Sequence, residues 1–173
     1  MKQSIDNPSL HEKMQQTKRA FFTYRNGILV DVLRRAGSPY KMIFGLNLPQ
    51  ISEIAAATGT DHSLAMALFS DRTTRESQLL APMIADPDAL SADDALELLI
   101  QAPDREAVDI LCHRLLRRLP FAAELAANPA LPPYPALRLA ANLIVSSPAA
   151  AAAVAARWPD NPVSATITES LRQ

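Results

Sequence analysis

Glycine, aromatic residues and cysteine are all scarce in this chain of 173 residues. It contains four glycines, 5% aromatic residues and the single Cys112. So little glycine and aromatic side chain disfavours β-sandwiches and the glycine-rich nucleotide-binding folds. One cysteine excludes an internal disulfide framework and fits a reducing compartment.

Long apolar runs and an excess of positive charge are also missing. No stretch approaches the roughly 18 apolar residues of a membrane span, and the first residues lack the apolar core of a secretory signal. We therefore expect a soluble, cytoplasmic protein with no membrane partner. The formal net charge of −1 gives no long-range attraction to nucleic acid. DNA binding would need lysines and arginines gathered on one face.

Apolar residues at helical spacing and fourteen prolines dominate what remains. No strand-like alternation is present, and prolines mark most of the breaks between apolar segments, so the pattern predicts many short helices. Gly27 weakens the first segment, because glycine costs about 1 kcal/mol inside a helix. The predicted helical segments are 9–36, three helices within 44–80, 91–101, 104–119, 121–127, 134–147, 148–157 and 162–172.

The segment 44–80 contains the clearest helix boundaries. Pro49 suits a first helical turn, and Gly59 suits a helix end. Thr60 and Asp61 can cap the following helix, and Asp71 or Thr73 can cap the third. Each helix then continues with an apolar stripe.

An approximate repeat relates the longer helices. The tripeptides Thr74-Arg75-Glu76 and Asp104-Arg105-Glu106 lie thirty residues apart, each at the start of an apolar run, and another helix starts near Tyr134. Helix pairs of this size bury their apolar faces only by stacking on neighbours, which predicts an all-α, HEAT-like solenoid, an armadillo-like α-α superhelix. We expect a flexible leader at 1–8 and one domain at 9–173, with N-terminal helices at 9–43, a repeat core at 44–147 and Ala-rich terminal helices at 148–173.

Several motifs between Phe44 and Cys112 occur in a recognisable order. They are Leu48-Pro49, the turn from Gly59 to His62, Arg75-Glu76 with Leu79-Leu80, and Ile84-x-Asp86-Pro87. Over these roughly seventy residues the chain resembles the DNA alkylation-repair family of AlkD-like HEAT-repeat DNA glycosylases, as a shortened and divergent relative.

The resemblance implies a curved solenoid that holds duplex DNA and excises N3- or N7-alkylated purines without metal or cofactor. In the family an aspartate stabilises the oxocarbenium-like sugar, and two tryptophans hold the cationic base. Asp109 and Cys112 match the second and third positions of the family segment of tryptophan, aspartate and cysteine. Arg105 stands where the tryptophan belongs, Arg138 takes the place of a cleft arginine, and Trp158 does not align.

These matches give two functional hypotheses. The first is a DNA-binding protein with weak or absent N-glycosylase activity through a catalytic Asp109, because the missing tryptophan argues against efficient catalysis. The second is a non-catalytic interaction scaffold, with a protein partner or homodimer formed through the Ala-rich C-terminal helices. Asp109 can also be read as part of a surface ion pair with Arg105 or His113. The predicted DNA-binding residues are Arg75, Arg105, Arg114 and Arg138.

Overall fold

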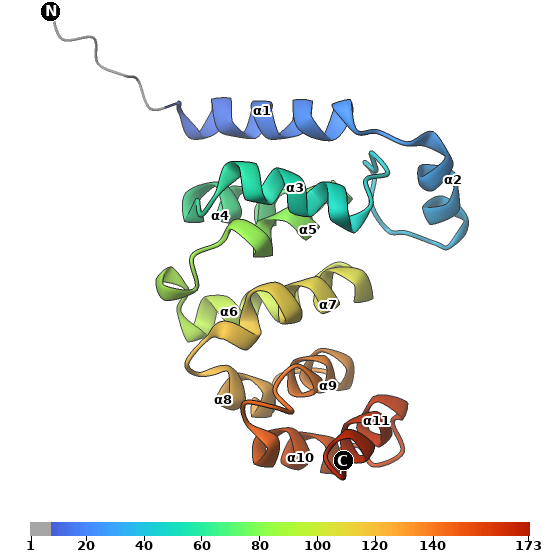
Figure 1. The fold of residues 1–173 in the computed structure, drawn as a ribbon, viewed down its shortest axis with the longest axis vertical. Coiled ribbons are helices and arrows are strands. Elements are labelled where there is room, and N and C mark those ends of the chain that lie inside the picture. Colours follow the sequence, from blue (N-terminus) through green and yellow to red (C-terminus); the bar gives the residue numbers. More distant parts are fainter. Residues whose placement is uncertain (1–7) are drawn as a thin grey trace, which may run out of the picture. The chain divides into compact units, whose positions relative to one another are not determined.

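The computed structural model describes residues 8–173, and these residues form an all-α structure of packed neighbouring helices (Figure 1). This confirms the predicted helical-repeat class of fold. The first part contains α1 (Leu10–Thr23), α2 (Gly27–Arg35), α3 (Leu48–Thr58), α4 (His62–Ser70) and α5 (Arg75–Ile84). The second contains α6 (Ala92–Ile100), α7 (Arg105–Arg114), α8 (Ala122–Ala127), α9 (Pro133–Ala141), α10 (Pro148–Ala156) and α11 (Pro162–Ser170), with 3₁₀ turns η1 (Pro87–Ala89) and η2 (Leu116–Arg118).

The helices group into two compact units, which are described separately. Unit 1 ends at Ala85 and unit 2 begins at Asp86. Residues 1–7, most of the predicted leader, lie outside the described residues. The assignment of 9–173 to one domain stays a prediction.

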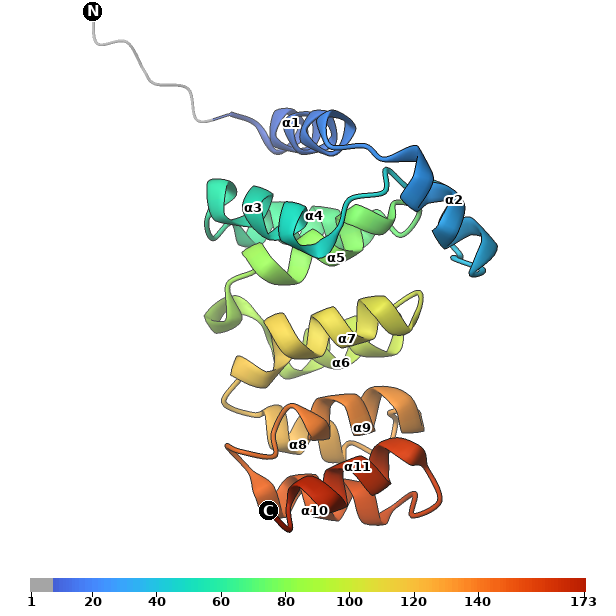
Figure 2. The same ribbon diagram turned by 45° about the vertical axis from the view of Figure 1, so that its right-hand side comes forward.

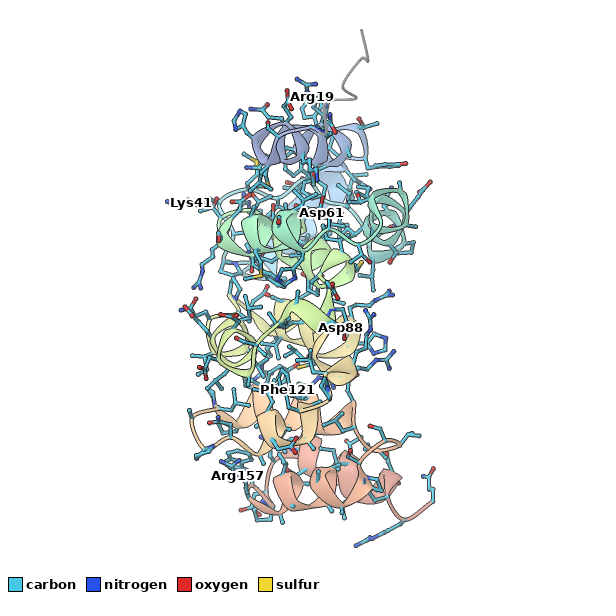
Figure 3. The ribbon with its side chains drawn as sticks, turned by 90° about the vertical axis from the view of Figure 1, so that its left-hand side faces the viewer. Arg19, Lys41, Asp61, Asp88, Phe121 and Arg157 are labelled. Carbon is cyan, nitrogen blue, oxygen red and sulfur yellow. The ribbon has the colours of Figure 1, made fainter. Side chains whose placement is uncertain are left out.

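The predicted boundaries of α3 and α4 are confirmed. Pro49 lies in the first turn of α3, and Gly59 ends that helix with φ of +72°. Asp61 begins α4, because its side chain accepts a hydrogen bond from the Leu64 backbone N–H at 3.0 Å. Figure 3 labels Asp61, which also accepts a hydrogen bond from Lys13 Nζ at 2.6 Å.

The predicted cap of α5 is wrong. Its N-cap is Thr74, whose side chain makes no capping bond, rather than Asp71 or Thr73. The Asp71 carboxylate instead accepts hydrogen bonds from the Thr73 and Ser77 hydroxyls, each at 3.0 Å. It also lies 3.2 Å from Lys18 Nζ, so these side chains hold it away from the backbone N–H groups of α5.

The segment predicted at 9–36 divides into α1 and α2 beside Gly27. Asn26 is the N-cap of α2, and its Oδ1 accepts from the backbone N–H groups of Ile28 and Leu29 at 3.0 and 3.3 Å. A capping side chain satisfies N–H groups that have no partner inside a helix. Asn26 therefore starts a second helix where glycine weakens the first.

A buried carboxylate organises the core of unit 1. Glu76 is 0% exposed. Its Oε1 accepts from the backbone N–H groups of Gly45 and Leu46 at 3.0 and 3.3 Å and from Arg75 Nη1 at 3.1 Å. Its Oε2 accepts from the Phe44 N–H at 3.1 Å. These bonds compensate a charge that burial alone would make costly.

Gly45 is required where the chain passes this carboxylate. Its φ is +83°, and a Cβ atom there would lie 2.3 Å from the carbonyl oxygen of Asn26. Asn26 in turn donates its backbone N–H to the Phe44 carbonyl at 2.9 Å. The linker before α3 is thus fixed both to Glu76 and to the start of α2.

Unit 2 has an apolar core of leucine and alanine, and α9 lies at its centre. This helix packs against α7, α8, α10 and α11, and small alanine side chains allow close approach of the neighbouring backbones (Figure 2). The buried side chains of α9 are Ala136, Leu137, Leu139 and Ala140. No helix among residues 8–173 combines the length and apolar character needed to cross a membrane.

Candidate functional site

Helix α7 places two of the predicted site residues one turn apart. Asp104 caps this helix, because its Oδ1 accepts from the Ala107 backbone N–H at 2.9 Å. The apolar side chains Val108 and Leu111 are buried in the core of unit 2. Arg105 and Asp109 lie away from that buried stripe, Arg105 exposed and Asp109 half-buried.

Asp109 joins α7 to α9. Its Oδ1 accepts hydrogen bonds from the Tyr134 hydroxyl at 2.8 Å and from Arg138 Nε at 2.7 Å. Tyr134 and Arg138 lie four residues apart on α9, so they share one helix face. The side chains of Asp109 and Arg138 are 35% and 34% exposed, so the ion pair is open to solvent on one side.

The structure identifies the ion-pair partner of Asp109. The carboxylate does form an ion pair, but with Arg138 on α9 rather than with Arg105 or His113 on its own helix. Within the described residues Oδ2 of Asp109 accepts no hydrogen bond, because both bonds converge on Oδ1. The second carboxylate oxygen therefore stays open to a ligand.

Arg105 covers the aromatic ring in this cluster. Its guanidinium carbon lies 4.6 Å from the centroid of the Tyr134 ring, which is cation–π distance. The protein's own arginine already occupies the Tyr134 face in this structure.

The electrostatics of the cluster favour a neutral tyrosine. Burial, followed by the hydrogen bond to Asp109, raises the pKa of Tyr134 to about 12. Tyr134 is therefore a hydrogen-bond donor at neutral pH rather than a base. Burial and the nearby Asp109 charge also raise the pKa of Cys112, which is 0% exposed and remains a thiol. A buried thiol is not a nucleophile, so Cys112 packs as a small apolar residue.

Asn142 supports Arg138 from the following turn. Its Nδ2 donates to the Arg138 carbonyl at 2.8 Å, and its Oδ1 lies 3.1 Å from Nδ1 of His113 on α7. Arg138 is thus held at Nε by Asp109 and at its backbone by Asn142. Within the described residues no hydrogen bond uses its two terminal nitrogens. They can donate together to a phosphate or carboxylate.

Of the predicted site residues, Arg105, Asp109 and Arg138 lie together in unit 2. Arg75 does not join them. Arg75 lies in unit 1, is 4% exposed, and donates from Nη1 to the Leu46 carbonyl at 2.9 Å as well as to Glu76. A guanidinium so covered does not present its charge to a phosphate, so we withdraw Arg75 as a DNA contact. Arg114 is the last residue of α7 and is half-buried.

Tyr134 and Asn142 were missed by the sequence analysis. The available signal was the spacing on α9, where Tyr134, Arg138 and Asn142 follow at intervals of four and therefore share one face. Trp158, the only tryptophan, lies 4.4 Å under the guanidinium of Arg157 rather than in this cluster.

Other regions of the described chain offer less chemistry. Residues 8–173 contain no group of three or more His, Cys, Asp and Glu side chains suited to a metal ion. Unit 1 has a cavity of about 500 Å³ beside α1, lined partly by Lys13, Tyr24, Glu53 and Ile54. Two charged groups of its lining, Lys13 and Asp61, already pair with each other at 2.6 Å.

Comparison with known proteins gives no family for this chain. No protein-family model, no curated protein and no solved structure matches it.

Proposed function

We propose that this chain is a cytoplasmic DNA-binding protein of the alkylation-repair type, with excision of alkylated purines weak or absent. The face of unit 2 formed by Arg105, Asp109, Tyr134 and Arg138 is the proposed contact with duplex DNA. We call these four residues the Asp109 cluster.

The geometry of Arg138 carries the proposal. The hydrogen bond from Nε to Asp109 orients this arginine while its terminal nitrogens remain available, so less side-chain entropy is lost when it binds an anion. The exposed Arg105 adds a second cation beside it. Two preoriented guanidinium groups on one face suit the phosphates of a nucleic-acid backbone.

The same geometry argues for little catalysis. Arg138 compensates the Asp109 charge, and Arg105 covers the Tyr134 ring. A cationic base would have to displace Arg105 before it could stack, and it would meet a repelling charge. Binding of the DNA backbone makes no such demand.

Duplex binding tests the proposal. Fluorescence anisotropy at two salt concentrations would compare plain duplex DNA with duplexes carrying an abasic-site analogue or N7-methylguanine. We expect salt-sensitive binding, which Arg138→Ala weakens while it reduces the slope of log K against log salt by about one. Arg19→Ala, on the exposed surface of α1, serves as the matched control. Equal binding by both variants would remove the Asp109 cluster from the interface.

Excision is tested separately on DNA containing N7-methylguanine. We expect little or no release of the base by the wild-type chain. If release is measurable, Asp109→Asn should abolish it while the circular dichroism spectrum stays unchanged. Release that persists in Asp109→Asn would remove this carboxylate from the chemistry.

A non-catalytic interaction scaffold is the second candidate, and one observation in unit 1 favours it. Helix α2 buries none of its residues, and Ile28 and Val32, one turn apart on it, are 79% and 53% exposed. Large apolar side chains gathered on an exposed face commonly mark a protein contact. Absence of DNA binding at low salt would leave this scaffold as the function.

A further inference from the structure

Helix α10 is apolar on every side, which is unusual for a helix at a protein surface. Its sequence from Pro148 to Ala156 contains only proline, alanine and valine. Ala151, Val154 and Ala155 are buried in unit 2, whereas the remaining alanines point outward, mostly exposed. A helix without a polar face is normally covered on both sides. The outward face of α10 is therefore a candidate contact surface.

A groove runs between α10 and α11, which lie side by side in Figures 1 and 2. Its volume is about 880 Å³, and most of the lining side chains are small. Small side chains allow a second backbone to approach closely. The lining includes Ala152, Ala156, Ala165 and Thr168.

Ser164 in the wall of this groove supplies an independent observation. Its side chain is 2% exposed, and its Oγ has no hydrogen-bond partner in the described part of the chain. Most buried hydroxyls in folded proteins have a partner. The unsatisfied hydroxyl shows that polar packing behind the groove wall is incomplete within the described residues.

The charges on the rim indicate which partner fits. Glu169 and Arg172 both line the groove, are exposed, and form no ion pair within residues 8–173. A two-fold axis brings the same surface of both copies together, so such a surface must be complementary to itself. An acid and a base on one rim meet this condition, because Glu169 of each copy can face Arg172 of the other. A strongly charged partner would instead favour a rim of one sign.

We propose that the groove between α10 and α11 is the contact surface of a two-fold homodimer. The outward alanines of α10 pack against the second copy, and Glu169 and Arg172 form two equivalent ion pairs across the axis. This interface is separate from the Asp109 cluster and does not depend on DNA binding.

A charge-swap experiment tests the proposal on the full chain. Analytical ultracentrifugation across micromolar concentrations should detect a dimer of the wild type. Glu169→Arg and Arg172→Glu should each raise its dissociation constant tenfold or more, because each brings like charges together. The double variant carrying both changes should restore it to within about threefold. Glu124→Arg, on the exposed surface of α8, is the matched control and should leave it unchanged.

A second variant tests the groove without changing charge. Ala152→Leu places a larger side chain at an exposed position of the lining, so it should weaken the dimer while the helical spectrum is kept. A wild type that stays monomeric at 100 μM would overturn the proposal. Single reversals without effect, or a double variant that fails to recover, would also overturn it.

Discussion

Each unit contains a carboxylate paired with an arginine, but the carboxylate is buried in unit 1 and partly exposed in unit 2. In unit 1 Glu76 is 0% exposed, and backbone N–H groups provide three of its four hydrogen bonds. In unit 2 Asp109 is about one-third exposed, and side chains provide both of its hydrogen bonds. A carboxylate fixed by backbone groups holds the fold. One held by side chains can exchange its partners for a ligand.

The repeated tripeptides show how this difference arises. Arg75 and Arg105 are the first residues of α5 and α7, so the thirty-residue spacing correctly identified equivalent helix starts. Yet Arg75 is buried against Glu76, whereas Arg105 is exposed over Tyr134. The arginine of the shared Arg-Glu pair therefore belongs to a buried ion pair in one unit and to an open cluster in the other.

Net charge separates the units as well. Residues 1–85 contain ten Lys and Arg against seven Asp and Glu, a net of +3, and residues 86–173 contain seven against eleven, a net of −4. An acidic unit attracts DNA only through cations held in place locally. The preoriented Arg138 is therefore more important to the proposed function than the overall charge of its unit.

The largest effect is expected from removing the buried carboxylate. Glu76→Ala leaves three backbone N–H groups and the Arg75 charge without their acceptor. Breaking a buried ion pair from one side costs about 3–5 kcal/mol, and we expect a loss in this range in urea unfolding. Glu53→Ala, at an exposed position on α3, should change the free energy of unfolding by less than about 0.5 kcal/mol. Similar losses in the two variants would contradict the structural role of Glu76.

A smaller loss is expected at the glycine beside this carboxylate. Gly45 and Gly37 have the same φ of +83°, but only a Cβ at position 45 would meet nearby atoms. Gly37→Ala should cost about 1–2 kcal/mol for the left-handed backbone alone. Gly45→Ala should cost more, because its Cβ would lie 2.3 Å from the Asn26 carbonyl oxygen. Thermal unfolding of both variants checks the order, and equal losses would contradict the steric argument.

Structural features that depend on residues close together in the chain could be predicted from the sequence, whereas those that depend on distant residues could not. Helix starts at Pro49 and Asp61 were predictable, because capping involves groups within a few residues. The cap of α5 was not, since Asp71 is held by the Thr73 and Ser77 hydroxyls and by Lys18 on α1, more than fifty residues away in the chain. Within the candidate site, the bond between Asp109 and Arg138 joins residues 29 apart on two helices, so no local sequence pattern predicts it. The burial of Arg75 depends on the path of the distant Leu46 backbone.

Asp71 provides a test that depends on pH. Burial by itself raises the pKa of Asp71, but hydrogen bonds from Thr74, Lys18, Ser77 and Thr73 outweigh it and bring the pKa below the ordinary 3.8. A folded-state pKa below the unfolded value adds stability above the unfolded pKa, and this stability is lost as pH falls through the folded one.

We therefore expect Asp71→Asn to cost about 1 kcal/mol at pH 7. The difference from wild type should shrink as the pH falls below 3.8, and urea unfolding at several pH values measures it. Asp31→Asn, at an exposed position on α2, is the control and should cost less than about 0.5 kcal/mol at pH 7. A cost for Asp71→Asn that stays constant down to pH 3 would contradict this account.

The smallest change in stability is expected at the Asp109 cluster of unit 2. Titration of the Tyr134 hydroxyl tests this site more directly than unfolding does. Asp109→Asn should change the free energy of unfolding by less than about 1 kcal/mol, because the pair is solvent-exposed on one side.

The same substitution removes the negative charge that accepts the Tyr134 hydroxyl, so the pKa of Tyr134 should fall from about 12 toward 10. It should not reach 10, since burial is the larger cause of the shift and remains. NMR of tyrosine labelled at Cζ follows this titration, with Tyr134→Phe to assign the resonance. A large loss of stability combined with an unchanged Tyr134 titration would make Asp109 a structural residue like Glu76, and the contrast between the two units would disappear.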